Sequence, residues 1–274
     1  RPQPAVPQML QCYVPNGCVR TLTLSEQQKQ QVRSWFHQIP NVAEMRSREV
    51  LLNTEHISFA YDNGRKALKD ISAKVYRGEM MAIVGRNGAG KSTFSKVVCG
   101  FEKQQKGTFT LYGKDLTPMT IRERAAYIGY VMQDPNQMIS KAMIRDEVGL
   151  GLSLKTKMTE DEIKERVDET LKVCGLYPFR SWPISALSYG QKKRVTIASI
   201  LAMQPEIVIL DEPTAGQDFR HYTDIMEFLR SLNDRGITII MITHDMHLML
   251  EYCERAVVFA DHRKIADAPC ENIL

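Results

Sequence analysis

The sequence predicts an α/β protein built on a parallel sheet, and three observations support this. The apolar runs IVIL (207–210) and ITIIMI (237–242) have the length and composition of strands buried on both faces. Helical patterns follow these runs, at about 219–232 and 246–252. A glycine-rich turn, GRNGAGKS (85–92), joins another apolar strand to a helical pattern. This alternation favours right-handed crossovers between parallel strands.

Length and composition place few restrictions on function. The 274 residues suffice for one large domain with a well-buried core, or for two small ones. The formal net charge of +4 does not single out nucleic acid as a partner. No apolar run approaches the roughly 20 residues of a bilayer-spanning helix, and no signal peptide is evident. The six cysteines are scattered, so we expect reduced thiols; Cys12 and Cys18 are the alternative pair for a disulfide or a metal.

Residues 1–49 differ in composition from the rest, and we expect a partly disordered linker or N-terminal arm. The segment opens with RPQPAVP and continues with a polar stretch. Ser25 and Gln28 have the spacing of a capping box, which predicts a short helix over 26–37. Because the chain begins with Arg1 instead of methionine, we expect it to be a fragment of a longer protein.

From Val50 onward, β-rich runs come first and helices follow. A helix is predicted within 158–176, with its apolar face formed by Ile163, Val167, Leu171 and Val173. A further strand is expected at RAVVFAD (255–261). The early runs are bounded by turn residues and read as strands: VLLNTEHISFAY (50–61), GEMMAIVG (78–85), GTFTLYG (107–113) and AAYIGYVMQ (125–133).

The glycine-rich turn has the G-x-x-x-x-G-K-S pattern of a phosphate-binding loop. Gly85, Gly88 and Gly90 allow the backbone to turn tightly and to direct N–H groups at a phosphate. The helix that follows adds the positive end of its dipole. Lys91 is expected to reach the β- and γ-phosphates, and Ser92 to offer its hydroxyl to Mg²⁺. Because strand and helix flank the pattern as required, the sequence predicts nucleotide binding.

Acidic and basic side chains stand where the buried strands end. Asp211 and Glu212 close the run EIVILDE, and the carboxyl ends of parallel strands are where ligands bind. Asp211 is expected to hold Mg²⁺, and Glu212 to act as general base on a water aligned with the γ-phosphate. His244 closes the next strand, where it is expected to bond a phosphate oxygen and position that water. The other histidines are expected to be surface or packing residues.

The order of these motifs resembles the nucleotide-binding domain of ATP-binding cassette (ABC) proteins, over about 50–274. The resemblance implies a P-loop NTPase core with a mixed or parallel sheet, an antiparallel β subdomain and an inserted α-helical subdomain at about 137–190. It rests on six elements in the family order: the phosphate loop (85–93), Gln133, LSYGQ (187–191), the DE pair (211–212), AGQD (215–218) and His244.

The resemblance also implies roles for residues outside the phosphate loop. Tyr61 would stack on adenine. Gln133 would ligate Mg²⁺ and sense the attacking water, which makes it catalytic together with Glu212 and His244. Asp218 would belong to a loop that communicates across a dimer. The nucleotide-binding set comprises Tyr61, Gly85, Asn87, Gly88, Gly90, Lys91, Ser92, Thr93, Ser188, Gly190 and Gln191, and the Mg²⁺ set Ser92, Gln133 and Asp211.

The LSYGQ segment, termed the signature below, is similar to the family's LSGGQ, with Tyr189 in place of a glycine. Ser188 stands where it can cap the helix expected over 191–202. In this family the signature faces a nucleotide bound to another domain, so Ser188 and the amides of Gly190 and Gln191 would complete a site across a dimer interface. The resemblance therefore implies a second nucleotide-binding domain as partner and poor hydrolysis by a monomer.

VMQDPNQM (131–138), together with LSYGQKKRV and DEPTAGQD, looks like the ATPases of energy-coupling-factor importers for vitamins or metal ions. It is similar in particular to tandem ATPases linked to hydroxymethylpyrimidine and thiamine uptake, in which two cassettes share one chain. These resemblances imply ATP and Mg²⁺ as cofactors, an integral membrane subunit as partner, and a peripheral position on the cytoplasmic face of the membrane. The membrane subunit would dock beside the Gln133 segment and the helices near 137–180.

Two other function classes share these nucleotide-binding motifs. The first is an ABC ATPase that acts on DNA or ribosomes. Only 97 residues without heptads separate Lys91 from Ser188, and the arm holds six basic against three acidic residues, so no nucleic-acid partner is expected. The second is a regulatory module that binds nucleotide without turnover, which the presence of both Glu212 and His244 disfavours.

Overall fold

The computed structural model describes residues 49–155, 157–215 and 219–273, and residues 49–274 form one compact unit. The helix expected over 26–37 and the pair Cys12 and Cys18 lie outside the described residues. The four described cysteines are buried free thiols, as expected: Cys99, Cys174, Cys253 and Cys270.

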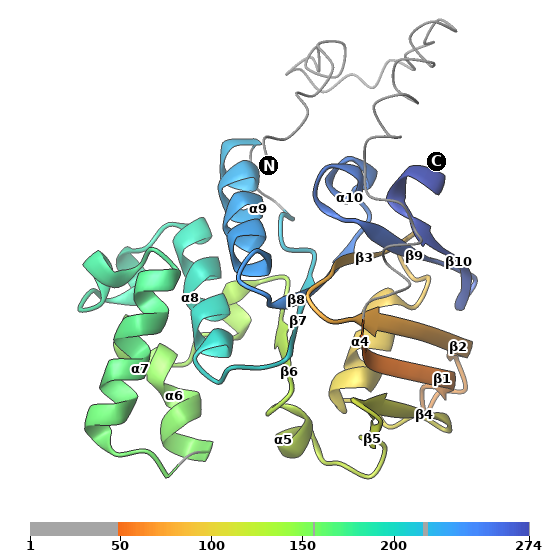
Figure 1. Ribbon diagram of the computed structural model, residues 1–274, viewed down its shortest axis with the longest axis horizontal. Helices are drawn as coiled ribbons and strands as arrows, with labels where there is room; N and C mark the ends of the chain where they lie inside the picture. The colour runs from red at the N-terminus through yellow and green to blue at the C-terminus, as the bar shows by residue number, and fades with distance from the viewer. Residues whose placement is uncertain (1–48, 156, 216–218, 274) are drawn as a thin grey trace, which may run out of the picture. The chain divides into compact units, whose positions relative to one another are not determined.

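Two sheets carry the fold (Figure 1). In the six-stranded sheet, ordered β10-β9-β3-β8-β7-β6, only the β10–β9 pair is antiparallel. The four-stranded sheet, ordered β2-β1-β4-β5, is antiparallel throughout. Its strands are β1 (Val50–Ala60), β2 (Lys66–Tyr76), β4 (Lys106–Leu111) and β5 (Lys114–Asp115). The six-stranded sheet contains β3 (Met80–Gly85), β6 (Ile128–Val131), β7 (Ile207–Asp211), β8 (Thr238–Thr243), β9 (Arg255–Ala260) and β10 (Arg263–Pro269).

Helices connect and cover the strands. Those of the α/β core are α4 (Lys91–Cys99), α5 (Ile121–Arg124), α9 (Phe219–Asn233) and α10 (Met246–Tyr252). A separate group of helices, α6 (Ile144–Lys155), α7 (Glu160–Val173) and α8 (Tyr189–Leu201), lies away from the four-stranded sheet (Figure 1). The short 3₁₀ turns are Pro135–Gln137, Tyr177–Phe179, Ile184–Ala186 and Cys270–Asn272. The prediction of an α/β fold with a parallel sheet is thus confirmed.

The six-stranded sheet is buried on both faces, which explains the continuous apolar strands. Along β3, Met80, Ala82 and Val84 join one hydrophobic cluster, whereas Met81 and Ile83 join the other. Successive side chains point to opposite faces of a strand, so a strand covered on both sides needs apolar residues throughout. The register places the ends of β3, β7 and β8 at one edge, where β3 leads directly into the phosphate loop.

A buried ion pair fixes the start of β3 against β9. The carboxylate of Glu79, which is fully buried, accepts two bonds from Arg255 Nη1, at 3.0 and 3.1 Å. Burial raises the pKa of Glu79 although Arg255 opposes the shift. Removing one partner of such a pair typically costs about 3–5 kcal/mol, because the other charge stays buried. The strand that precedes the phosphate loop is therefore firmly held.

Three strands escaped prediction, of which β5 is only two residues long. β2 contains Lys, Ala and Asp residues that are poor strand formers, and it is ordered by pairing with β1. β10 has only exposed and half-buried residues before its last position, so it has no apolar pattern to detect.

Candidate active site

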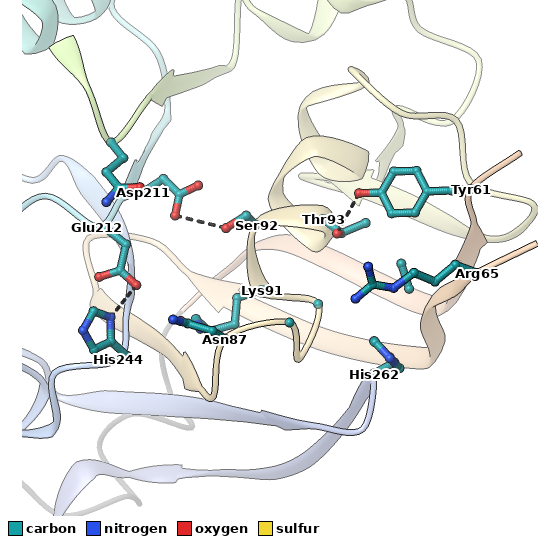
Figure 2. Close-up of a pocket in the computed structure, with 14 residues that line it drawn as sticks. Tyr61, Arg65, Asn87, Lys91, Ser92, Thr93, Asp211, Glu212, His244 and His262 are labelled. Carbon is teal, nitrogen blue, oxygen red and sulfur yellow. Dashed lines mark hydrogen bonds and ion pairs between the residues drawn. The ribbon is translucent and has the colours of Figure 1, made fainter. Parts of the chain in front are cut away.

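A cavity of about 420 Å³ lies at the sheet edge where β3, β7 and β8 end. Its lining contains eleven of the residues predicted to bind nucleotide or metal or to act in catalysis: Tyr61, Asn87, Gly88, Gly90, Lys91, Ser92, Thr93, Gln133, Asp211, Glu212 and His244. Figure 2 shows how the side chains that it labels converge from separate elements of the fold. Segments up to 201 positions apart in the sequence, from Tyr61 to His262, thus meet in one cavity.

The phosphate loop has the backbone that an anion site requires. Gly88 and Gly90 have φ angles of 81° and 106°, a region that favours glycine. Gly90 is the N-cap of α4, and no side chain caps this helix end. The first-turn amides of α4 therefore have no side-chain acceptor and are free to bind an anion. Lys91 is buried and donates to the carbonyl of Gly85 at 2.7 Å, so its ammonium group is held over the loop.

Gly85 does not line the cavity, but its φ of 149°, which residues with a side chain rarely adopt, fits the tight backbone turn that was predicted. An added Cβ there would lie 2.2 Å from the carbonyl oxygen of Phe259. Glycine at this position thus allows β9 to approach the end of β3 closely. The carbonyl of Gly85 accepts the hydrogen bond from Lys91.

The arrangement of oxygen atoms suits a divalent cation. Ser92 Oγ and Asp211 Oδ1 are 3.2 Å apart and are drawn as a bonded pair in Figure 2. Hydroxyl and carboxylate oxygens are the ligands that Mg²⁺ prefers. The exposed Gln133 also lines the cavity and could add its amide oxygen. Among the described residues, no cluster of three His, Cys, Asp or Glu side chains forms a competing metal site.

Glu212 and His244 form a pair at the cavity wall. His244 Nδ1 and Glu212 Oε1 are 2.9 Å apart, and the Glu212 side chain is largely buried, with 14% of it exposed. Glu212 has a φ of 45°, rare for a residue with a side chain, and its amide donates to Ile242 of the adjacent strand. The unusual backbone directs the carboxylate toward His244 and the cavity.

Three polar residues of the cavity region were not predicted. Arg65 and His262 line it beside Tyr61, and His262 Nδ1 is buried with no hydrogen-bond partner among the described residues. Tyr130 is not part of the cavity lining, but its hydroxyl donates to Asp211 Oδ2 at 2.7 Å. Both carboxylate oxygens of Asp211 are thus engaged, by Ser92 and by Tyr130. None of the three stands in a motif, so only the folded chain identifies them.

The signature residues lie outside this cavity. Ser188 is the N-cap of α8, as predicted: its side chain accepts the amide of Gln191, whose side chain accepts the amide of Ser188. The amide of Gln191, which we expected to serve a phosphate, is therefore engaged within the helix. Asp218 lies outside the described residues.

Comparisons with known proteins identify the family. The ABC transporter family model matches residues 68–215, and a model described as "AAA domain, putative AbiEii toxin, Type IV TA system" matches 180–251. A putative ABC transporter ATP-binding protein of Clostridium perfringens is 55% identical over 245 residues, which is 89% of this chain and 43% of that protein. A putative ABC transporter ATP-binding protein of Enterococcus faecalis is 59% identical over 235 residues, covering 85% and 41%. The chain spans about two fifths of the length of these curated relatives.

Solved structures agree. CbiO1 of Clostridium perfringens, part of the ABC transporter complex cbiONQ, matches with a TM-score of 0.77 and 37% identity over 82% of this chain and 90% of that one. The dimeric cassette MJ0796, in a post-hydrolysis state bound to ADP and Pi, matches with a TM-score of 0.70 and 28% identity, covering 80% and 99%. The chain therefore belongs to the ATP-binding cassette family of transporter ATPases.

Proposed function

We propose that this chain is the ATP-hydrolysing part of a membrane importer of the energy-coupling-factor type. The observation that supports this most directly is the meeting of Lys91, the Ser92–Asp211 pair and the Glu212–His244 pair in one cavity. This set supplies a phosphate cradle, oxygen ligands for a cation, and a carboxylate beside an exposed histidine. Of the described helices, none is both long and apolar enough to cross a membrane. From the motif similarity to importer ATPases, we propose peripheral attachment to a membrane subunit at the cytoplasmic face.

Each group has a task in the proposed reaction. Bound Mg²⁺ supplies positive charge at the phosphate oxygens; Ser92, Asp211 and Gln133 would hold it. The loop amides and Lys91 bind the phosphates. Glu212 accepts a proton from the attacking water, and His244 keeps the Glu212 carboxylate oriented and donates to a phosphate oxygen. Tyr61 covers the adenine end of the cavity.

We further propose that the full-length protein carries two cassettes. The curated relatives are more than twice as long as the stretch that matches, and the motif sequences are similar to tandem importer ATPases. The solute class, a thiamine precursor or a metal ion, rests on that motif similarity alone. The signature would then complete the nucleotide site of the partner cassette, as in the dimeric arrangement proposed from the sequence.

An uptake experiment tests this function. Cells that lack the gene are given the full-length protein or its Glu212→Gln variant, and uptake of labelled hydroxymethylpyrimidine, thiamine, cobalt and nickel is compared. We expect one solute to require the intact glutamate. Uptake of every solute at parental rates with Glu212→Gln would contradict the proposal, and salt-sensitive association of the protein with ribosomes or DNA would favour the alternative class.

A further inference from the structure

Three side chains on one face of α8 bind a single loop, residues 132–137, termed the Gln133 loop. Lys193 Nζ donates to the carbonyl oxygens of Met132 at 2.7 Å and Gln133 at 2.8 Å. Tyr189 Oη donates to the same Gln133 oxygen at 3.2 Å. Lys192 Nζ lies 3.4 Å from Oδ1 of Asn136. Positions 189, 192 and 193 are three and four residues apart, so they share one helix face.

Lys193 is buried completely, with 0% of its surface exposed. Burying an ammonium group is unfavourable unless its protons find acceptors. Both of its acceptors are main-chain carbonyls that follow directly on β6, where strand pairing has ended at Val131. Burial lowers the pKa of Lys193 to about 8, while the nearby Asp211 and Asp134 oppose this shift. A methionine would fill the same space, so the charged group is explained by its bonds to the loop.

Tyr189 adds a second bond to the same carbonyl. It occupies the position at which this chain departs from the usual LSGGQ signature, where a glycine has no side chain to offer. A carbonyl oxygen has two lone pairs, and the Gln133 oxygen receives one donor from Lys193 and one from Tyr189. The backbone of Gln133 is therefore tied to the helix that the signature begins, while the Gln133 side chain lines the cavity.

We propose that Lys193 and Tyr189 are positioning residues that fasten the Gln133 loop to the start of α8, so that engagement of the signature sets the position of the Gln133 side chain. This inference rests on the proposed ATPase function. The inference gives Tyr189 a function: its bond to the Gln133 carbonyl makes the signature and the Gln133 loop move as one body. These bonds affect the rate of hydrolysis but not the binding of ATP to the phosphate loop, because neither Lys193 nor Tyr189 lines the cavity.

The test compares Lys193→Met, Tyr189→Phe and the control Lys164→Met, which makes the same change at an exposed lysine of α7. Turnover by the full-length protein in its membrane complex is measured together with ATP affinity and thermal unfolding. We expect Lys193→Met to lower kcat about 10- to 100-fold, because a small misplacement of a catalytic group has effects of this size. Tyr189→Phe should lower kcat about 2- to 5-fold, the equivalent of one hydrogen bond. KM for ATP should change less than about twofold in both variants.

A double-mutant cycle separates positioning from a structural role. Gln133→Ala removes the side chain but keeps the carbonyl oxygen that Lys193 and Tyr189 bind. If they act through the Gln133 side chain, Lys193→Met and Tyr189→Phe should have little further effect on kcat in the Gln133→Ala background. If the kcat of each double variant fell by the product of the two single-variant reductions, the proposal would be overturned. A kcat equal to the parental value in both Lys193→Met and Tyr189→Phe would also overturn it.

Two further outcomes are distinguishable. If Lys193→Met does not fold, the exposed Tyr189→Phe and its cycle with Gln133→Ala decide the question alone. Two controls in the same assay report on the proposed function itself: a parental complex without ATP turnover refutes the ATPase assignment, and turnover that survives Glu212→Gln refutes the general-base role of Glu212. If Glu212→Gln abolishes turnover but Lys193→Met and Tyr189→Phe leave it unchanged, only the positioning role of Lys193 and Tyr189 is refuted.

Discussion

Two helix N-termini of this chain are both candidates for phosphate binding, yet they differ in what occupies them. Helix α4 begins at Gly90 with no side-chain cap and faces the cavity of its own chain. Helix α8 begins at Ser188 with a closed capping box and lies outside that cavity. The first helix end is ready for an anion in the single chain. At the second, a side chain of the same helix already occupies one of the amides.

The capping box at α8 leaves specific groups for a ligand. The oxygen of Ser188 accepts the Gln191 amide, but its hydroxyl proton remains available as a donor. A capping side chain satisfies only one of the orphan amides of a helix start, so the amides of Tyr189 and Gly190 are not capped by it. Serine can thus keep α8 folded in the single chain and still donate to a phosphate supplied by a partner.

The largest effect is expected at Glu212, which lines the cavity that the start of α4 faces. Glu212→Gln should lower hydrolysis by about 10²- to 10⁴-fold, because the amide cannot accept the water proton. ATP affinity should be retained, since the groups around α4 are intact. The ATP-bound closed dimer should then accumulate, which size-exclusion chromatography in the presence of ATP measures. Rapid dissociation of the ATP-bound variant would indicate that the two helix ends do not share the nucleotide.

Lys91→Ala changes the first helix end alone. The loss of the ammonium group should weaken ATP binding about 10- to 100-fold, a range typical of one charged contact. Calorimetric titration of ATP into the variant measures this. Exposed Lys164→Ala is the matched control and should bind as the parent chain does. Equal affinity in Lys91→Ala would contradict the phosphate role of the loop lysine.

Ser188→Ala changes the second helix end alone. It removes the cap, at a stability cost of about 0.5–2 kcal/mol, and the hydroxyl donor. We expect turnover to fall about tenfold while ATP affinity of the single chain stays constant, because one hydrogen bond to a charged group is lost. Thr159→Ala is a matched control, since it removes an equivalent capping box from α7. A similar loss of turnover in Thr159→Ala would mean that capping alone explains the effect.

Tyr130→Phe makes the smallest change, beside the first helix end. The variant removes the hydroxyl that holds Asp211 Oδ2 and keeps the ring. We expect the Mg²⁺ concentration needed for half-maximal turnover to rise about 2- to 5-fold, the equivalent of one hydrogen bond. Turnover measured across a Mg²⁺ titration tests this, and an unchanged midpoint would show that Ser92 orients Asp211 unaided.

Sequence alone predicts the first helix end better than the second. The glycines, Lys91 and Ser92 lie together in one segment, and β7 and β8 were evident from their continuous apolar runs. The links of Tyr130 to Asp211 and of Lys193 to Gln133 join residues 81 and 60 positions apart. They depend on strand order and on the packing of α8, which no local pattern encodes.

The same reason explains the missed strands. β2 and β10 lack apolar runs, and they pair with β1 and β9 respectively. Their strand conformation therefore depends on the paired strand and not on a local sequence pattern. Conversely, the helices predicted at 219–232 and 246–252 were found nearly in place, as α9 and α10, because apolar spacing and short connections define them locally.

In the mechanism proposed above, the start of α8 serves a nucleotide held by another domain. The most direct measurement is the ATP-hydrolysis rate of this chain held strictly monomeric, as verified by light scattering, beside its ATP affinity. We predict normal binding with turnover at least about 10²-fold below that of the assembled full-length protein, the cost of losing preorganised donors to the phosphate. Hydrolysis by the monomer at the rate of the assembled protein would contradict the account.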